Sequence, residues 1–224
     1  MRPPLRLCLC LCLLLCPAAA HAAGRSLRDD VGRLLSPPAL VAVAAGLGAG
    51  AALRPWDEDL RFRLQRRPLR LLLDAAEPYG AKEIAFPAAL GLWLGGKARG
   101  APHLQRLGSD LGRALLLSNA LVAPLKLAVD RRRPDGDGHS FPSGHAGNAF
   151  AASGVLARRY GRRAGLPLYA LSALVAAQRI HAGRHFAGDV VTGAVLGATA
   201  GWAVGLEGLH AASNGHGAAL VWRF

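Results

Sequence analysis

Apolar residues run along the chain in segments of helical length, which charged stretches or Gly and Pro separate. The segments predict core helices at residues 40–53, 84–94, 109–129, 143–160, 166–180 and 189–204, and a charged surface helix at 57–70. They are rich in Ala and Gly, small residues that allow helices to pack closely. An alternation typical of strands occurs only at 218–224. The pattern predicts an all-α fold, a helical bundle of about six core helices.

The first residues have the pattern of a secretory signal. Arg2 and Arg6 form a short positive segment before an apolar run at 7–16. This run is too short to span a hydrocarbon core of ~30 Å as a helix. Small residues at Ala20 and Ala22 predict cleavage after Ala22. The expected domains are a signal at 1–22, a lead-in at 23–36, a helical domain at 37–206 and a tail at 207–224.

The composition narrows the function classes. All four cysteines lie at positions 8–16, so the mature chain would have no disulfide, thiol nucleophile or cysteine-based metal site. The 224 residues are 52% hydrophobic, which excludes disorder, and the net charge of +13 favours an anionic partner. The apolar runs are at or below the about 20 residues that a membrane-spanning helix needs. A membrane-spanning bundle and a soluble bundle both stay open.

Three clusters of polar residues stand beside helix ends. Lys126 and Arg133 are two helical turns apart and can share a face before Pro134 stops the helix. Ser143 is a candidate N-cap, and the start of the helix after it offers free N–H groups to an anion. His185 and Asp189 have helical i, i+4 spacing, so the carboxylate can orient the imidazole.

Each cluster alone is more typical of ordinary structure, but together they supply the groups that break a phosphate ester. Arg179 adds a third cation to Lys126 and Arg133, and His145 follows the candidate N-cap. Fixed cations, an anion-binding helix start, and two histidines, one with a carboxylate partner, provide charge stabilisation, a nucleophile and an acid.

Two alternatives come from other function classes. His181, His185 and Asp189 have a spacing that could bind Zn²⁺, with His139 or His145 completing the set. The surrounding arginines disfavour this site because they repel a dication and attract a phosphate. A non-catalytic membrane protein, whose basic loop only contacts lipid headgroups, is the other alternative, but binding alone needs no histidines.

These residues resemble the motifs of the type 2 phosphatidic acid phosphatases. That family shares its fold with vanadium haloperoxidases and bacterial non-specific acid phosphatases. The resemblance covers residues 126–189 and rests on Lys126 to Arg133-Pro134, Pro142-Ser143-Gly144-His145, and Arg179 to His185 and Asp189.

The resemblance implies a role for each matching residue. His185 would be the nucleophile, Asp189 would orient it, and His145 would protonate the leaving group and then activate water. The phosphate-binding residues would be Lys126, Arg133, Ser143, Gly144 and Arg179. No metal or other cofactor is expected.

The signal, the small-residue apolar helices and the resemblance together suggest a substrate and a location. We expect a membrane-associated or multi-pass enzyme of the cell envelope, with its active site facing the periplasm and no nucleic-acid partner. The substrate would be a phosphorylated lipid such as phosphatidate, a polyprenyl diphosphate or a lipid A phosphate. The alternative enzyme is a soluble periplasmic acid phosphatase that acts on small esters.

Overall fold

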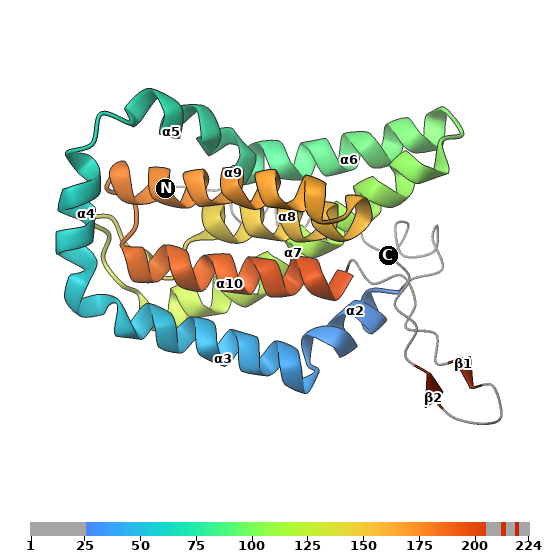
Figure 1. The fold of residues 1–224 in the computed structure, drawn as a ribbon, viewed down its shortest axis with the longest axis horizontal. Coiled ribbons are helices and arrows are strands. Elements are labelled where there is room, and N and C mark those ends of the chain that lie inside the picture. Colours follow the sequence, from blue (N-terminus) through green and yellow to red (C-terminus); the bar gives the residue numbers. More distant parts are fainter. Residues whose placement is uncertain (1–25, 205–211, 214–217, 220–224) are drawn as a thin grey trace, which may run out of the picture.

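The protein is a bundle of helices, as predicted (Figure 1). The structure, a computed structural model, describes residues 26–204, 212–213 and 218–219. The predicted signal at 1–22 and most of the tail at 207–224 lie outside these residues. The helices are α2 (Leu27–Leu34), α3 (Pro37–Ala52), α4 (Asp57–Gln65), α5 (Arg70–Ala76), α6 (Lys82–Ala98), α7 (Pro102–Val129), α8 (Gly144–Tyr160), α9 (Arg162–His181) and α10 (Ala187–Val204).

Short elements complete the described chain. Two 3₁₀ turns, η1 (Arg54–Trp56) and η2 (Glu77–Gly80), precede α4 and α6. Strands β1 (Ala212–Ser213) and β2 (Ala218–Ala219) pair antiparallel. Of the predicted strand at 218–224, residues 218–219 form β2 and the rest lies outside the described residues.

The main differences from the sequence-based elements are short helices. The polar lead-in contains α2, which Ser26 and Asp29 start with a reciprocal capping box. The charged segment at 57–70 is not one helix, because α4 ends at Gln65 and α5 begins only after Pro68. Helices of about two turns are too short for hydrophobic periodicity to reveal, so the pattern does not predict α2 and α5 as separate helices.

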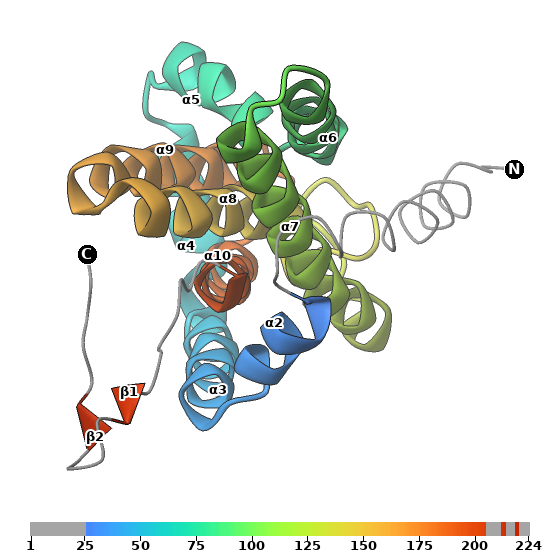
Figure 2. The same cartoon turned by 90° about the vertical axis from the view of Figure 1, so that its right-hand side faces the viewer.

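Helix α10 lies at the centre of the bundle, between α3 and α8 (Figure 2). Gly193, Gly197 and Gly201 share one face of α10, because they are spaced by four residues. A Cβ atom at any of them would collide with a backbone carbonyl oxygen at the start or along the length of α8. These three glycines therefore let the two backbones touch, and we call this contact the glycine seam.

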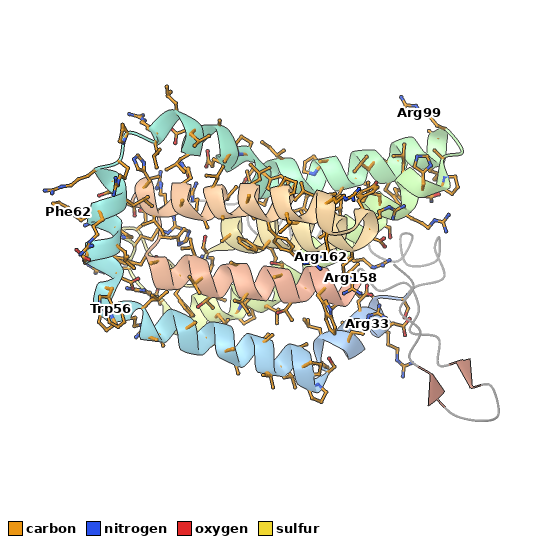
Figure 3. The ribbon with its side chains drawn as sticks, in the orientation of Figure 1. Arg33, Trp56, Phe62, Arg99, Arg158 and Arg162 are labelled. Carbon is orange, nitrogen blue, oxygen red and sulfur yellow. The ribbon has the colours of Figure 1, made fainter. Side chains whose placement is uncertain are left out.

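The bundle has two ends that differ in content. Helix α4 runs across one end, where Trp56 and Phe62 lie, and α2 lies toward the other end, where the α6–α7 turn carries Arg99 (Figures 1 and 3). We call these the α4 end and the α2 end. Helices α3, α6, α7, α8, α9 and α10 run between them (Figure 1).

Among the described residues, three stretches are long and apolar enough to cross a membrane by length and composition: Pro37–Gln65, Pro102–Val129 and Ala187–Val204. The first of these contains α3, η1 and α4, and the chain turns between the two helices (Figure 1). Several apolar side chains on the outside of the bundle are exposed, among them Val41, Ile84 and Leu127. These stretches support association with a membrane.

Candidate active site

The three predicted motifs meet at the α4 end. Lys126 lies in the last turn of α7, Ser143 caps α8, and Arg179 lies in the last turn of α9. His185 lies in the turn between α9 and α10, and the Ser143 N–H donates to the Asp189 carbonyl oxygen at 3.0 Å. The first turns of α8 and α10 are thereby joined side by side. The glycine seam makes this approach possible, because a Cβ on Gly193 would collide with the Ser143 carbonyl.

The carboxylate of Asp189 is fully buried and held on both oxygens. Oδ2 accepts from Ser140 Oγ at 2.5 Å and from the Phe186 N–H at 3.0 Å. Oδ1 accepts from Arg131 Nη1 at 2.9 Å. Three hydrogen bonds leave the carboxylate little freedom to rotate, so its position relative to His185 is fixed by the fold.

His185 faces this carboxylate from the preceding turn. Its Nδ1 lies 3.9 Å from Asp189 Oδ2, and this buried atom has no hydrogen-bond partner among the described residues. The distance is longer than a hydrogen bond, as catalytic contacts often are without substrate. Burial lowers the pKa of His185 to about 4, with Lys126 and Arg133 acting in the same direction. The imidazole is therefore uncharged at neutral pH, as a nitrogen nucleophile must be.

Glu77 connects the other histidine to a predicted cation. Its Oε1 lies 2.7 Å from Arg179 Nη1 and 3.7 Å from His145 Nε2. Glu77 belongs to η2, and a Cβ on Gly80 would lie 2.6 Å from the His145 carbonyl oxygen, so η2 presses directly against the start of α8. The carboxylate can thus orient the His145 ring and the Arg179 guanidinium toward the same place.

The remaining cations lie on the segment after α7. Lys126 Nζ donates to the His139 carbonyl oxygen at 2.8 Å, and the Arg133 N–H donates to the Asp137 carbonyl oxygen at 2.7 Å. These bonds fold the segment back on the helix end. The Nε atoms of Arg133 and Arg179 are buried and have no hydrogen-bond partner within residues 26–204. Buried donors of this kind need an acceptor, and a phosphoryl oxygen is one.

Ser143 and Gly144 provide the helix start that the sequence predicted. The Ser143 side chain accepts from the Ala146 N–H at 3.5 Å, which is a long capping bond. The first N–H groups of α8 have no partner within the helix and can bind an anion.

The structure adds site residues that sequence reasoning missed. Arg131, Ser140 and Glu77 each contact a predicted site residue, and Asp57 contacts Arg131. Arg131 is one of three consecutive arginines, and nothing in the sequence distinguishes it from Arg132. Asp57 and Glu77 precede the motifs by about fifty residues or more, so local spacing carries no signal for them.

The metal-site alternative finds no support in the described part of the chain. No group of three or more His, Cys, Asp or Glu side chains lies close enough there to hold a metal ion. His139 lies away from such a set, with its Nδ1 3.0 Å from Asp130 Oδ1. The groups that converge are instead fixed cations around two histidines.

Known proteins resemble this chain in sequence and in fold. The family model of the PAP2 superfamily matches residues 135–206. The matched residues make up about a third of the chain. This match confirms the resemblance over the second and third motifs, because it begins just after Pro134 and ends two residues beyond α10.

Three curated phosphatases are similar to part of the chain. A lipid A 1-phosphatase from Porphyromonas gingivalis is 36% identical over 112 residues, which are 48% of this chain and 25% of the relative. A lipid A 4'-phosphatase from Helicobacter pylori is 32% identical over 99 residues, 39% of this chain and 50% of the relative. A decaprenylphosphoryl-5-phosphoribose phosphatase from Mycobacterium tuberculosis is 35% identical over 111 residues, 45% of this chain and 60% of the relative. The chain thus spans between a quarter and three-fifths of the curated relatives that it matches.

Solved structures confirm the predicted fold. The crystal structure of Aquifex aeolicus LpxE matches with a TM-score of 0.54 and 26% identity, over 65% of this chain and 92% of that chain. The first transmembrane PAP2 type phosphatidylglycerolphosphate phosphatase from Bacillus subtilis matches with a TM-score of 0.61 and 22% identity, over 79% of this chain and 94% of that chain.

Proposed function

We propose that this chain is a phosphatase that hydrolyses a phosphate monoester or diphosphate of a lipid through a phosphohistidine at His185. The observation that carries the proposal is the uncharged His185 beside the fixed Asp189 carboxylate, facing cations whose buried Nε donors lack an acceptor within residues 26–204. The PAP2 superfamily match and the phosphatase names of the relatives support the reaction class.

In the first step, His185 Nε2 attacks phosphorus, because Nδ1 faces Asp189. A P–N bond forms and the P–O bond to the leaving group breaks, while His145 donates a proton to the leaving oxygen. The imidazole becomes positively charged, and the adjacent Asp189 carboxylate stabilises that charge. Burial and the nearby cations lower the pKa of His145 to about 3, so the Glu77 carboxylate, 3.7 Å from His145 Nε2, and the bound phosphate would have to raise this pKa for the proton transfer.

The phosphoryl oxygens carry the charge that develops in this step. Lys126, Arg133 and Arg179 would bind these oxygens, and the Ser143 hydroxyl and Gly144 N–H would complete the site at the start of α8. In a loose transition state, charge spreads over the non-bridging oxygens, so fixed donors around them lower the barrier.

In the second step, a water molecule replaces the leaving group. His145 now takes a proton from the water, the oxygen attacks phosphorus, and the P–N bond breaks. His185 returns to its uncharged form, His145 returns to its protonated form, and inorganic phosphate leaves. Both histidines are thus regenerated at the end of the cycle.

A lipid substrate is the proposed choice over a small ester. The three curated relatives are named for lipid A or decaprenylphosphoryl substrates, and apolar side chains are exposed along the outside of the bundle. An acyl or prenyl chain can lie against these helices while its phosphate reaches the α4 end.

The test is a phosphate-release assay on the purified protein. The panel contains phosphatidate, a polyprenyl diphosphate, a lipid A phosphate and p-nitrophenyl phosphate, each with and without a chelator. We expect the highest kcat/KM on a lipid and no loss on chelation. Highest activity on p-nitrophenyl phosphate would favour the soluble acid phosphatase instead, and chelator loss that zinc restores would contradict the metal-independent mechanism.

We further propose that the protein belongs to the cell envelope, with the active site facing the periplasm. Helix α3 carries the chain from the α2 end to the α4 end (Figure 1). If the signal delivers residue 26 to the periplasm, a periplasmic active site requires both ends of the bundle to lie on that side. The membrane contact is then along the side of the bundle rather than through α3.

Reporter cysteines test this arrangement, because residues 26–204 contain no cysteine. Arg67→Cys marks the α4 end and Arg99→Cys the α2 end, in a chain whose four leader cysteines are replaced by serine. An impermeant maleimide applied to cells with a permeable outer membrane should label both positions. Labelling of Arg67→Cys alone would keep the periplasmic site but place α3 across the membrane, whereas labelling of Arg99→Cys alone would contradict a periplasmic site.

A further inference from the structure

One arginine at the α4 end is engaged with carboxylates instead of facing the phosphate position. Arg131 Nη1 donates to Asp189 Oδ1 at 2.9 Å, and its Nη2 donates to Asp57 Oδ2 at 2.8 Å. The guanidinium lies over the ring of Phe186, 4.1 Å from the ring centroid. Both carboxylates are buried, with side chains that are 2% exposed for Asp57 and 0% for Asp189.

We propose that Arg131 and Asp57 are positioning residues for the nucleophile, a role that rests on the proposed function. Arg131 binds Asp189 Oδ1, which leaves Oδ2 toward His185. The carboxylate cannot rotate without breaking this bond. Arg131 therefore acts through Asp189, and its effect reaches the reaction by way of the His185 ring.

Asp57 keeps the Asp189 charge available to His185. An arginine paired with Asp189 alone would make a neutral pair, and little negative charge would remain to stabilise the imidazolium that forms on attack. Two carboxylates that share one guanidinium keep one net negative charge in the trio. This charge acts strongly on the His185 ring because the Asp57 and Asp189 carboxylates that carry it are buried.

Asp57 also connects a separate element to the site. Its Oδ1 accepts from the Gly188 N–H at 2.9 Å, one residue before Asp189. Asp57 is the first residue of α4, which crosses the end of the bundle (Figure 1). The start of α4 is thus bonded both to the backbone that carries Asp189 and to the guanidinium that orients it.

Arg131 differs from the cations assigned to phosphate binding. Both of its terminal nitrogens bind carboxylates, whereas Arg133 and Arg179 each have a buried Nε without a partner within residues 26–204. Arg132, the residue between Arg131 and Arg133, is exposed. It provides a matched control with the same side chain on the same segment.

The test compares Arg131→Gln, Asp57→Asn and the double variant with Arg132→Gln, using the lipid phosphate that the wild type turns over fastest. We expect kcat to fall about 10- to 100-fold in the Arg131 and Asp57 variants with KM nearly unchanged. The double variant should lose little more than Arg131→Gln, since both changes disrupt one network. Arg132→Gln should match the wild type.

Chemical rescue separates positioning from a general loss of structure. Arg131→Ala leaves a space between two carboxylates and the Phe186 ring, and millimolar guanidinium should restore part of kcat there but none in His185→Ala. If the other variants unfold at a much lower temperature, Arg131→Lys replaces them in the comparison of kcat, because it keeps the positive charge between the two carboxylates.

Several results would overturn the inference. An unchanged kcat in Arg131→Gln, or a raised KM with kcat intact, would contradict positioning and in the second case place Arg131 on the substrate. Failure of rescue together with a large drop in melting temperature would make the pair purely structural. An inactive wild type would instead refute the proposed function, so the two failures are distinguishable.

Discussion

Each end of the bundle contains a buried network of aspartates and arginines, and the two networks differ in how completely they are paired. At the α2 end, Asp30 is fully buried and binds Arg113 Nε at 2.7 Å as well as Arg33. The other two nitrogens of Arg113 donate to Ser109 Oγ at 3.2 Å and to Asp110 Oδ1 at 2.9 Å. Each of the three guanidinium nitrogens of this central arginine has an acceptor within the fold.

The α4 end also has a central arginine bound to carboxylates, but other polar atoms around it are unpaired. Arg131 pairs with two buried carboxylates, as Arg113 does at the α2 end. Around it, however, His185 Nδ1 and the Nε atoms of Arg133 and Arg179 lack partners in the part of the chain that the structure describes. A buried polar atom without a partner costs free energy, and a bound phosphate would provide acceptors for the two arginines. Arg158 Nε, toward the α2 end, also lacks a partner within the described residues, so it is the grouping of such atoms beside two histidines that distinguishes the α4 end.

The comparison separates two uses of the same residue types. A completed network fixes the packing of α2 against α7, and changes there should affect stability. An incomplete network of cations beside two histidines should affect turnover. Substitutions at each end of the bundle test this division.

Removal of the nucleophile should give the largest effect on activity. His185→Ala should lower kcat by about 10⁴-fold or more, because the covalent step is lost. The melting temperature in detergent should stay within a few degrees of the wild type, since the Nδ1 atom makes no hydrogen bond that would be lost. Full phosphate release by the purified variant would contradict the site.

Removal of the central carboxylate at the α2 end should do the reverse. Asp30→Asn leaves Arg113 and Arg33 without their shared anion in a buried place, and breaking such a pair costs about 3–5 kcal/mol of unfolding free energy. Thermal unfolding should show a large drop, while kcat per folded molecule stays unchanged. The exposed variant Glu58→Gln is the control and should cost less than about 1 kcal/mol.

The glycine seam connects the two ends, and a side chain there should disturb both. A Cβ in Gly197→Ala would collide with the backbone of Gly147, which cannot move aside as a flexible side chain would. We expect a loss of about 1–3 kcal/mol in unfolding free energy, together with reduced kcat, because α8 and α10 carry Ser143 and Asp189. Gly91→Ala in α6 meets nothing within 4 Å and should be neutral or stabilising.

The smallest expected effect is on the pH dependence of stability. Burial lowers the pKa of His185 from 6.5 to about 4. The unfolded chain binds this proton below pH 6.5 and the folded chain does not until the pH nears 4, so stability is complete above pH 6.5 and is lost as the pH falls. The contribution of this one group to the slope should be at most about 1.4 kcal/mol per pH unit, and thermal unfolding should show a shallower slope in His185→Asn.

The helices and the motifs could be predicted because their signals are local. Ser143 before an apolar run predicts a helix at 143–160, and α8 follows from Gly144 to Tyr160. The spacing of four residues likewise predicts that His185 and Asp189 face each other, and they do so although His185 lies in the turn before α10. These signals need only a few neighbouring residues, and the fold keeps those residues together.

The supporting residues could not be predicted because they come from distant segments. Asp57 reaches Arg131 across 74 positions of sequence, and Glu77 reaches Arg179 across 102. Three consecutive arginines look alike in the sequence, yet Arg131 binds two carboxylates and Arg132 is exposed. Only the packing of α4 and η2 against the ends of α8, α9 and α10 assigns their different roles.

The most direct test of the central claim is to trap the covalent intermediate. A lipid substrate labelled on its phosphate is mixed with the purified protein and quenched with alkali within a single turnover, since phosphohistidine survives alkali. The account predicts label on the wild type at His185, found by peptide mapping, and none on His185→Ala. Label on another residue, or turnover by the wild type with no labelled protein at any time, would contradict it.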